Sequence, residues 1–222
     1  KKRTVPSAAY WKLLEIFDRY NPGRAAVKNE SVQTGNSKKA LEELYTGRCM
    51  AMDIGASPGG WSYCLATKLQ TQRVIACDPA AYMHPVVRNL VAEDVRDEFV
   101  KDFTQEEQKE DAKNLTHMDM AYDSWKNEAK TCGQICHWRM RGDEGLRKLH
   151  AEAMKLSLFV CDMNDALESS CDLLYQVFKE KLYEPPCLAV VTFKNTCKSK
   201  AEFQERKRAM IAKLREDGVL MH

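Results

Sequence analysis

The chain has 222 residues, of which 44% are hydrophobic, so it can bury one sizeable core and requires no second domain. Its formal net charge of +2 excludes attraction of the whole molecule to nucleic acid, and any such binding must come from local basic patches. An odd number of cysteines, nine, with no secretory signal and no apolar run of transmembrane length, predicts no membrane association and an intracellular, reducing compartment, with nucleus or cytoplasm favoured over an organelle.

The first predicted element is a helix over residues 6–17. Its apolar residues, among them Tyr10 and Leu13, recur at helical spacing and account for its packing face. Lys12 falls outside that face, so spacing alone makes it an exposed helix lysine. The polar segment that follows, at about residues 24–46, is predicted to be an insertion and mainly an exposed loop.

A glycine-rich turn joins the next two predicted elements, a buried strand at 49–52 and a helix at 61–69. Glycines let the backbone approach a bound molecule closely, and the start of the helix offers free N–H groups. The spacing G-x-x-x-G-G fits neither the dinucleotide turn G-x-G-x-x-G nor the P-loop, so neither a dinucleotide nor a triphosphate is favoured. The candidate ligand-binding residues of this turn are Asp53, Gly55, Ala56, Ser57, Pro58, Gly59, Gly60 and Trp61.

Acids end the next two predicted strands. The strand at 73–78 ends in Asp78, whose carboxylate could accept both hydroxyls of a ribose. A third strand is predicted at 89–94, and Asp94 at its end could accept a hydrogen bond from an adenine amino group. Taken singly, each acid is better explained as a solvated strand end, but their joint placement favours a nucleoside ligand.

Residues 104–155 are predicted to form a second insertion, either a lid that selects the substrate or an elaboration without such a role. It holds residues of zinc-ligating type, namely His117, Cys132, Cys136, His137 and His150. Their spacing lacks the paired C-x-x-C arrangement of convincing zinc sites, so the sequence predicts no metal site.

The last two predicted strands lead into Asp162 and Lys194. Open α/β sheets bind ligands at the carboxyl ends of their strands, so both residues are candidates for a site there. Each also has a simpler interpretation. Asp162 could cap the helix that follows it, and Lys194 has rivals in Lys198 and Lys200.

The turn at 53–61, Asp-Ile-Gly-Ala-Ser-Pro-Gly-Gly-Trp, resembles the cofactor motif of the FtsJ/RrmJ-type S-adenosylmethionine-dependent RNA ribose 2′-O-methyltransferases. Residues 6–17 resemble that family's amino-terminal helix, and Cys161-Asp162-Met163 resembles its fourth-strand motif. Within that family, these motifs most resemble those of the RlmM-like branch, which modifies a cytidine of large-subunit ribosomal RNA.

The resemblance covers about residues 4–100 and 155–220 and implies a single α/β domain over residues 1–222. The expected fold is Rossmann-like and doubly wound, with a mostly parallel sheet and helices on both faces. Residues 219–222 look like the start of a further strand, so the last strand is expected beyond residue 222. The implied cofactor is S-adenosylmethionine and the implied partner is an RNA substrate.

The resemblance also implies roles for three residues. Lys12 matches the family's first catalytic lysine, Asp162 its catalytic aspartate, and Lys194 its second lysine, the general base, although a match without a gap to the RlmM-like branch would fall on Thr192. A lysine is mostly protonated at neutral pH, so a lysine base needs burial or a nearby cation, here Lys12, while Asp162 would align the lysines. The family adds a glutamate on a later strand, and no match to it is present.

The resemblance therefore predicts an S-adenosylmethionine-dependent RNA ribose 2′-O-methyltransferase that acts on ribosomal RNA. Three alternatives stay open. The chain could be a catalytically silent RNA-binding relative, it could methylate the messenger cap or transfer RNA, or it could act on an acceptor other than RNA. The sequence does not indicate an oligomeric state.

Overall fold

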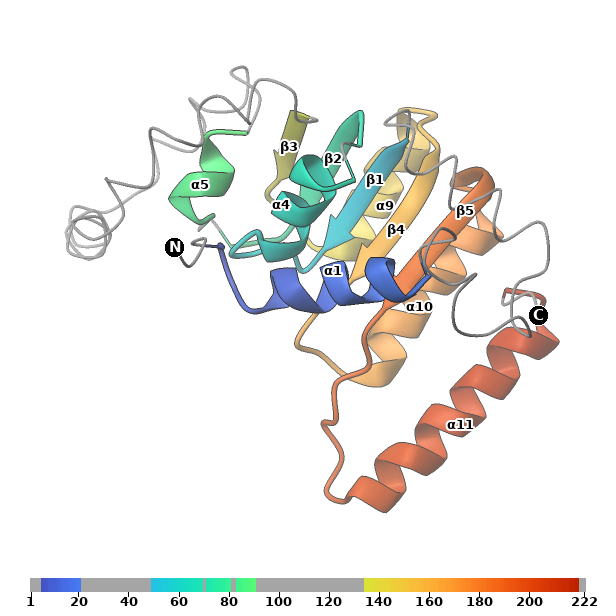
Figure 1. Ribbon diagram of the computed structural model, residues 1–222. Coiled ribbons are helices and arrows are strands. Elements are labelled where there is room, and N and C mark those ends of the chain that lie inside the picture. Colours follow the sequence, from blue (N-terminus) through green and yellow to red (C-terminus); the bar gives the residue numbers. More distant parts are fainter. Residues whose placement is uncertain (1–4, 21–48, 70, 81–82, 91–133, 220–222) are drawn as a thin grey trace.

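A parallel sheet organises the part of the chain that the computed structural model describes, residues 5–20, 49–69, 71–80, 83–90 and 134–219 (Figure 1). Its strands are β1 Met50–Ile54, β2 Arg73–Cys77, β3 Gln134–Trp138, β4 Leu156–Cys161 and β5 Tyr183–Val191. Their order across the sheet is β3-β2-β1-β4-β5, and all neighbours run parallel. The chain moves outward from β1 to β3 and then returns to place β4 on the other side of β1. Ligands bind such sheets at this switch point, outside the carboxyl ends of β1 and β4.

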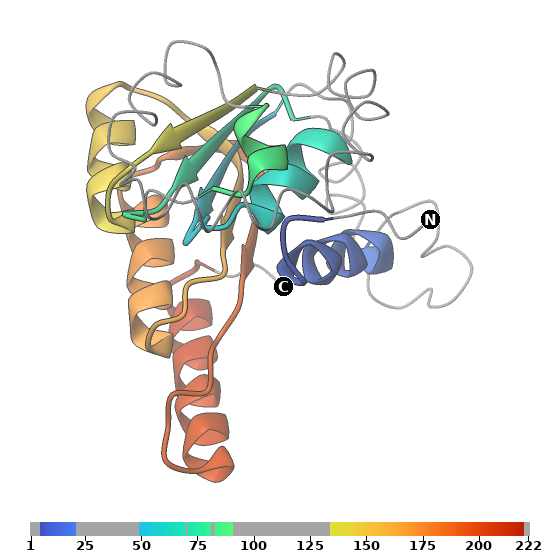
Figure 2. The same cartoon turned by 90° about the vertical axis from the view of Figure 1, so that its left-hand side faces the viewer.

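Two apolar cores lie on opposite faces of the sheet, because successive strand residues point in opposite directions. On β1, Ala51 belongs to one core and Met52 to the other, and both are fully buried. Among the described residues, α1 (Ala9–Tyr20) and α4 (Gly60–Thr67) cover the first face, and α9 (Gly142–Ala151), α10 (Leu167–Lys179) and α11 (Lys200–Glu216) cover the second (Figure 2). The predicted α/β, Rossmann-like, doubly wound sheet with helices on both faces is confirmed.

The predicted third strand at 89–94 is wrong at its start. Residues 89 and 90 form the turn after a short helix, α5 Pro85–Arg88, and residues 91–94 lie outside the described part of the chain. Helix is favoured here because Pro85 occupies its first position and the His84 side chain accepts a hydrogen bond from the Val86 N–H.

The strand that pairs with β2 is β3, which lies within the predicted insertion at 104–155. The insertion therefore ends earlier than expected, because β3 is a strand of the sheet and α9 packs on one of its faces. The polar residues Gln134 and His137 disguise the strand in the sequence, although His137 is buried in the structure. The predicted insertion at 24–46 and residues 220–222 lie outside the described residues.

Strand β5 has an irregular start. Leu156 of β4 pairs with Tyr183, but Leu158 pairs with Leu188, so the register shifts in between. Pro185 and Pro186 lie in this stretch, where a strand tolerates residues that have no N–H to donate. None of the helices in the described ranges is long and apolar enough to cross a membrane.

Candidate active site

The turn between β1 and α4 requires glycine at two positions. Gly55 has φ of 78° and Gly59 has φ of 104°, a region that other residues rarely adopt. A Cβ on Gly55 would lie 2.9 Å from Met163 Cγ, and one on Gly59 would lie 2.6 Å from Val87 Cγ2. The backbone of the turn is thus packed from both sides and keeps one shape.

Asp78 fastens this turn to the end of β2. Its Oδ2 accepts a hydrogen bond from the Ser57 N–H at 3.1 Å, and its Oδ1 accepts one from the Ala80 N–H at 2.7 Å. The Gly55 N–H donates to the Cys77 carbonyl, at 3.0 Å. Each carboxylate oxygen has two acceptor sites, so Asp78 can still accept hydroxyl groups of a ligand.

Asp53, on β1, is a buried carboxyl with one free oxygen. Only 1% of the residue is exposed, and its Oδ2 accepts a hydrogen bond of 2.6 Å from the Ser62 hydroxyl on α4. Its Oδ1 is buried and has no hydrogen-bond partner among the described residues. Burial raises the pKa of Asp53 to about 7, against the lowering effect of the Ser62 hydrogen bonds, and the charges of Asp162 and Asp78 raise it further. A cationic donor group at Oδ1 would stabilise the ionised form.

The side chain of Trp61 is buried and does not face the candidate site at the carboxyl ends of the strands. It is 2% exposed, and its Nε1–H donates to the Ala9 carbonyl at the start of α1, at 2.7 Å. The neighbouring Gly60 lies so close to α1 that a Cβ would be 2.2 Å from Ser7 Oγ and 3.1 Å from the Tyr10 nitrogen. These contacts join the cofactor turn to the helix that carries Lys12.

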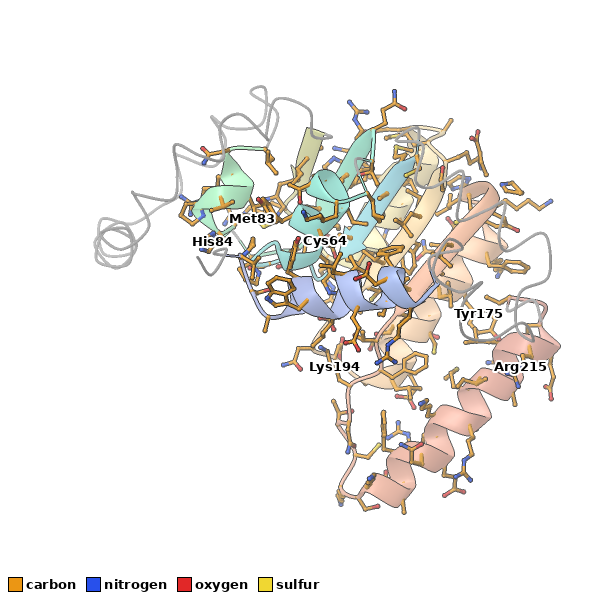
Figure 3. All side chains as sticks on the ribbon, in the orientation of Figure 1. Cys64, Met83, His84, Tyr175, Lys194 and Arg215 are labelled. Carbon is orange, nitrogen blue, oxygen red and sulfur yellow. The ribbon has the colours of Figure 1, made fainter. Side chains whose placement is uncertain are left out.

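Asp162 joins the two predicted catalytic lysines. Lys194 Nζ donates to Asp162 Oδ1 at 2.5 Å, and Lys12 Nζ lies 3.7 Å from Asp162 Oδ2. The Asp162 side chain is 10% exposed, whereas those of Lys194 and Lys12 are 27% and 55% exposed. Asp162 follows β4, Lys194 follows β5 and Lys12 lies on α1. Figure 3 labels Lys194 on the segment after β5. The two amino groups thus remain accessible to a substrate at the carboxyl edge of the sheet.

Thr192 holds the carboxylate of Asp162 from a third direction. Its hydroxyl forms a short hydrogen bond with Asp162 Oδ1, and its N–H donates to the Cys161 carbonyl at 2.9 Å. In the sequence, Thr192 stands out only as the position at which the RlmM-like branch carries a lysine. Thr192 and Lys194 are two residues apart, which is the spacing of side chains on one side of a strand, and this spacing is the signal that could have identified Thr192.

The other predicted cofactor-binding residues differ in burial and in whether the structure describes them. Ala56 is buried, and the Pro58 carbonyl accepts a hydrogen bond from the His84 N–H at 2.9 Å, so α5 supports the turn from outside. Asp94 lies outside the described residues. The sequence did not single out Ser62 or His84.

The residues considered for zinc do not converge where the structure describes them. Cys136 and His137 are consecutive on β3, so their side chains point to opposite faces of the sheet. His150 lies on α9 beside Glu180, with Nδ1 3.6 Å from Oε2. Among the described residues no group of three or more potential ligands is close enough to hold a metal ion, and His117 and Cys132 are not among them.

A doubly wound sheet, a glycine turn after β1, an acid after β2 and an accessible Lys–Asp–Lys cluster place the protein in the Rossmann-like class, with a candidate site at the carboxyl edge of its sheet. The model of the FtsJ-like methyltransferase family matches residues 5–187, so the chain belongs to that family. It is therefore a methyltransferase of the class that uses S-adenosylmethionine. Comparison with curated proteins gave no match to the chain.

Replacing Asp53 by Asn is expected to remove one pH dependence of stability. Between about pH 4 and pH 7 the folded protein holds a proton on Asp53 that the unfolded chain releases, since burial raises the pKa from 3.8 to about 7. The free energy of unfolding should therefore fall as pH rises through this window and level off above it. Urea unfolding at several pH values, without cofactor, should show the fall in the wild type and not in the Asp53→Asn protein. Equal slopes for the two proteins would contradict the assignment.

Replacing Trp61 by Phe is expected to reduce turnover much more than cofactor affinity. Phe keeps an apolar ring in the core but cannot hold the start of α1, and misplacing a reacting group by an ångström can cost about 100-fold in rate. We expect methyl transfer to fall roughly tenfold, with the dissociation constant for S-adenosylmethionine nearly unchanged in calorimetry.

The matched control for this experiment is Trp138→Phe, because Trp138 is buried in the core on the other face of the sheet. It should keep wild-type turnover. Equal losses in both variants would indicate a general loss of core packing and would remove the coupling assigned to Trp61.

Proposed function

We propose that the protein methylates the 2′-hydroxyl of an RNA ribose, and that its substrate is ribosomal RNA. The observation that carries the proposal is the Lys12–Asp162–Lys194 cluster, with Asp162 2.5 Å from one amino group and 3.7 Å from the other. Two accessible amino groups beside one buried carboxylate suit an acceptor hydroxyl that must lose a proton and that lies between phosphate groups. The resemblance to the RlmM-like branch supports ribosomal RNA over other RNAs.

The residues present fit S-adenosylmethionine. The backbone of the turn from Gly55 to Gly60 gives close approach, Asp78 can accept the ribose hydroxyls, and the buried free Oδ1 of Asp53 can accept from an ammonium group. Trp61 would contribute its backbone N–H at the start of α4, since its side chain is bonded to Ala9. When bound, the cofactor supplies an activated methyl group.

The protein then has to orient the acceptor hydroxyl and take its proton. In this proposal Lys194 Nζ, in its neutral form, receives the proton, and the hydroxyl oxygen takes the methyl group. Asp162 contacts both amino groups, so its role is to hold the two lysines in line with the acceptor hydroxyl.

The test of this proposal uses the protein with labelled S-adenosylmethionine and total RNA. Label should enter RNA, and mapping should place it on a ribose 2′-oxygen of ribosomal RNA. Label on another RNA would correct the substrate. Label on protein and none on RNA would overturn the proposal.

Replacing Lys194 by Ala is expected to abolish methyl transfer and leave the affinity for S-adenosylmethionine largely unchanged, because Lys194 acts on the acceptor and not on the donor. Lys12→Ala and Asp162→Ala should give the same pattern. Loss of a general base lowers the rate by about 100-fold to 10,000-fold. The matched control is Lys198→Ala, an exposed lysine of the same segment, which should remain active. Full activity of the Lys194→Ala protein would remove this residue from the site.

Thr192 allows a second test of the cluster. Thr192→Val keeps the shape of the side chain but removes the hydroxyl that bonds to Asp162, and a hydrogen bond to a charged group contributes about 1.5–3 kcal/mol. Turnover should fall roughly 10-fold to 100-fold if that contribution is expressed in the transition state. Thr192→Ser keeps the hydroxyl and should stay near wild type in the same steady-state assay. If Val and Ser behave alike, the hydroxyl has no part in aligning Asp162.

A further inference from the structure

Trp11 on α1 has no place in the site described so far. Of the large apolar side chains that the structure describes, it is the exposed one, at 51%. The same helix buries Tyr10, Leu13 and Phe17 almost completely, so α1 already has a full packing face without it. An indole that contributes little to the core and stays in water is available for a ligand.

Buried aromatic rings hold the base of Trp11 in place. The Trp11 ring meets the ring of Tyr10 edge to face, with centroids 5.0 Å apart and planes at 89°. Tyr10 is 3% exposed and packs in turn on Tyr63 of α4, with centroids 5.9 Å apart. The helix start is also held by the bond from Trp61 to Ala9. Trp11 is therefore an exposed ring on a rigid support, which lowers the entropy cost of stacking a ligand on it.

Trp11 is the immediate neighbour of Lys12, so their Cα atoms are about 3.8 Å apart. Lys12 reaches Asp162 at 3.7 Å, and the cluster holds two amino groups for one carboxylate, so the amino groups outnumber the acids at this point of the surface. The acidic residue one turn beyond Trp11, Glu15, is paired with Arg19 at 2.5 Å and leaves no uncompensated negative charge there. The surroundings of the indole thus suit a polyanion that carries flat rings.

We propose that Trp11 stacks on a base of single-stranded RNA next to the ribose that is methylated. This inference rests on the proposed function and specifies its substrate class as an unpaired RNA segment. Trp11 and Lys12 are consecutive exposed residues of α1, so in this proposal the base next to a ribose held at Lys12 and Lys194 reaches the indole. The bases of a duplex are already stacked on one another, so only an unpaired strand can offer a base to Trp11.

The experiment compares two variants on three probes without methyl donor. The variants are Trp11→Phe, which keeps an aromatic face, and Trp11→Leu, which keeps apolar bulk without one. The probes are an oligoadenylate of about ten nucleotides, an abasic oligomer of the same length and charge, and the oligoadenylate paired with its complement. Fluorescence anisotropy of a label on the probe gives the dissociation constants.

Trp11→Leu should weaken binding of the oligoadenylate by roughly 5-fold to 150-fold, the range expected for one stacked base, and Trp11→Phe should weaken it much less. On the abasic oligomer and the duplex, the three proteins should bind alike. S-adenosylmethionine affinity and the thermal midpoint should be the same in all three proteins, which shows that the fold is intact.

Equal binding of the oligoadenylate by Trp11→Leu and wild type would overturn the inference. An equal loss of affinity for the abasic oligomer would also overturn it. So would light scattering that shows a dimer in the wild type and a monomer in Trp11→Leu, because Trp11 would then belong to a contact between protein chains. Failure of the proposed function gives a different result: no RNA is methylated, although binding of the oligoadenylate still depends on Trp11.

Discussion

The hydrogen bond from Trp61 to the Ala9 carbonyl connects the two halves of the site, and the other assignments depend on it. One half is the glycine turn, which α4 continues. The other is α1, which brings Lys12 to Asp162. Such a bond contributes only about 1 kcal/mol to stability, yet the alignment it maintains matters far more, because the distance between donor and acceptor groups controls the rate steeply. The close approach of Gly60 to Ser7 leaves α1 little room to shift toward α4.

The strands β1, β2, β4 and β5 and the acids and lysine that follow them could be predicted from the sequence. Both are set by local signals, because apolar strands and the polar residues that follow them can be recognised without knowledge of distant contacts. Lys12 was the least evident of the three catalytic candidates, since its distance to Asp162 arises from packing of α1 on α4. A family motif, and not its spacing, identified it.

The third strand shows where that approach failed. The run before Asp94 looks like a strand because it is apolar, but its start is governed by Pro85 and by the side chain of His84, which favour a helix. β3 contains Gln134 and His137 and therefore has a weak apolar signal, and only pairing with β2 makes it a strand. In the same way, nothing local indicates that Trp61 faces inward or that Thr192 binds Asp162. Those are tertiary contacts between segments distant in the chain.

The two prolines in β5 limit where a further strand can pair with the described sheet. β5 is the last strand on its side of the described sheet, and an outer strand offers unpaired N–H and C=O groups to any extended chain nearby. Pro185 and Pro186 have no N–H, and the shift in register between Tyr183 and Leu188 bends the backbone there. The first half of this strand is thus a poor template for pairing. Within the described sheet, the regular stretch of β5 is the one that leads toward Lys194, so a further strand would pair next to the candidate site.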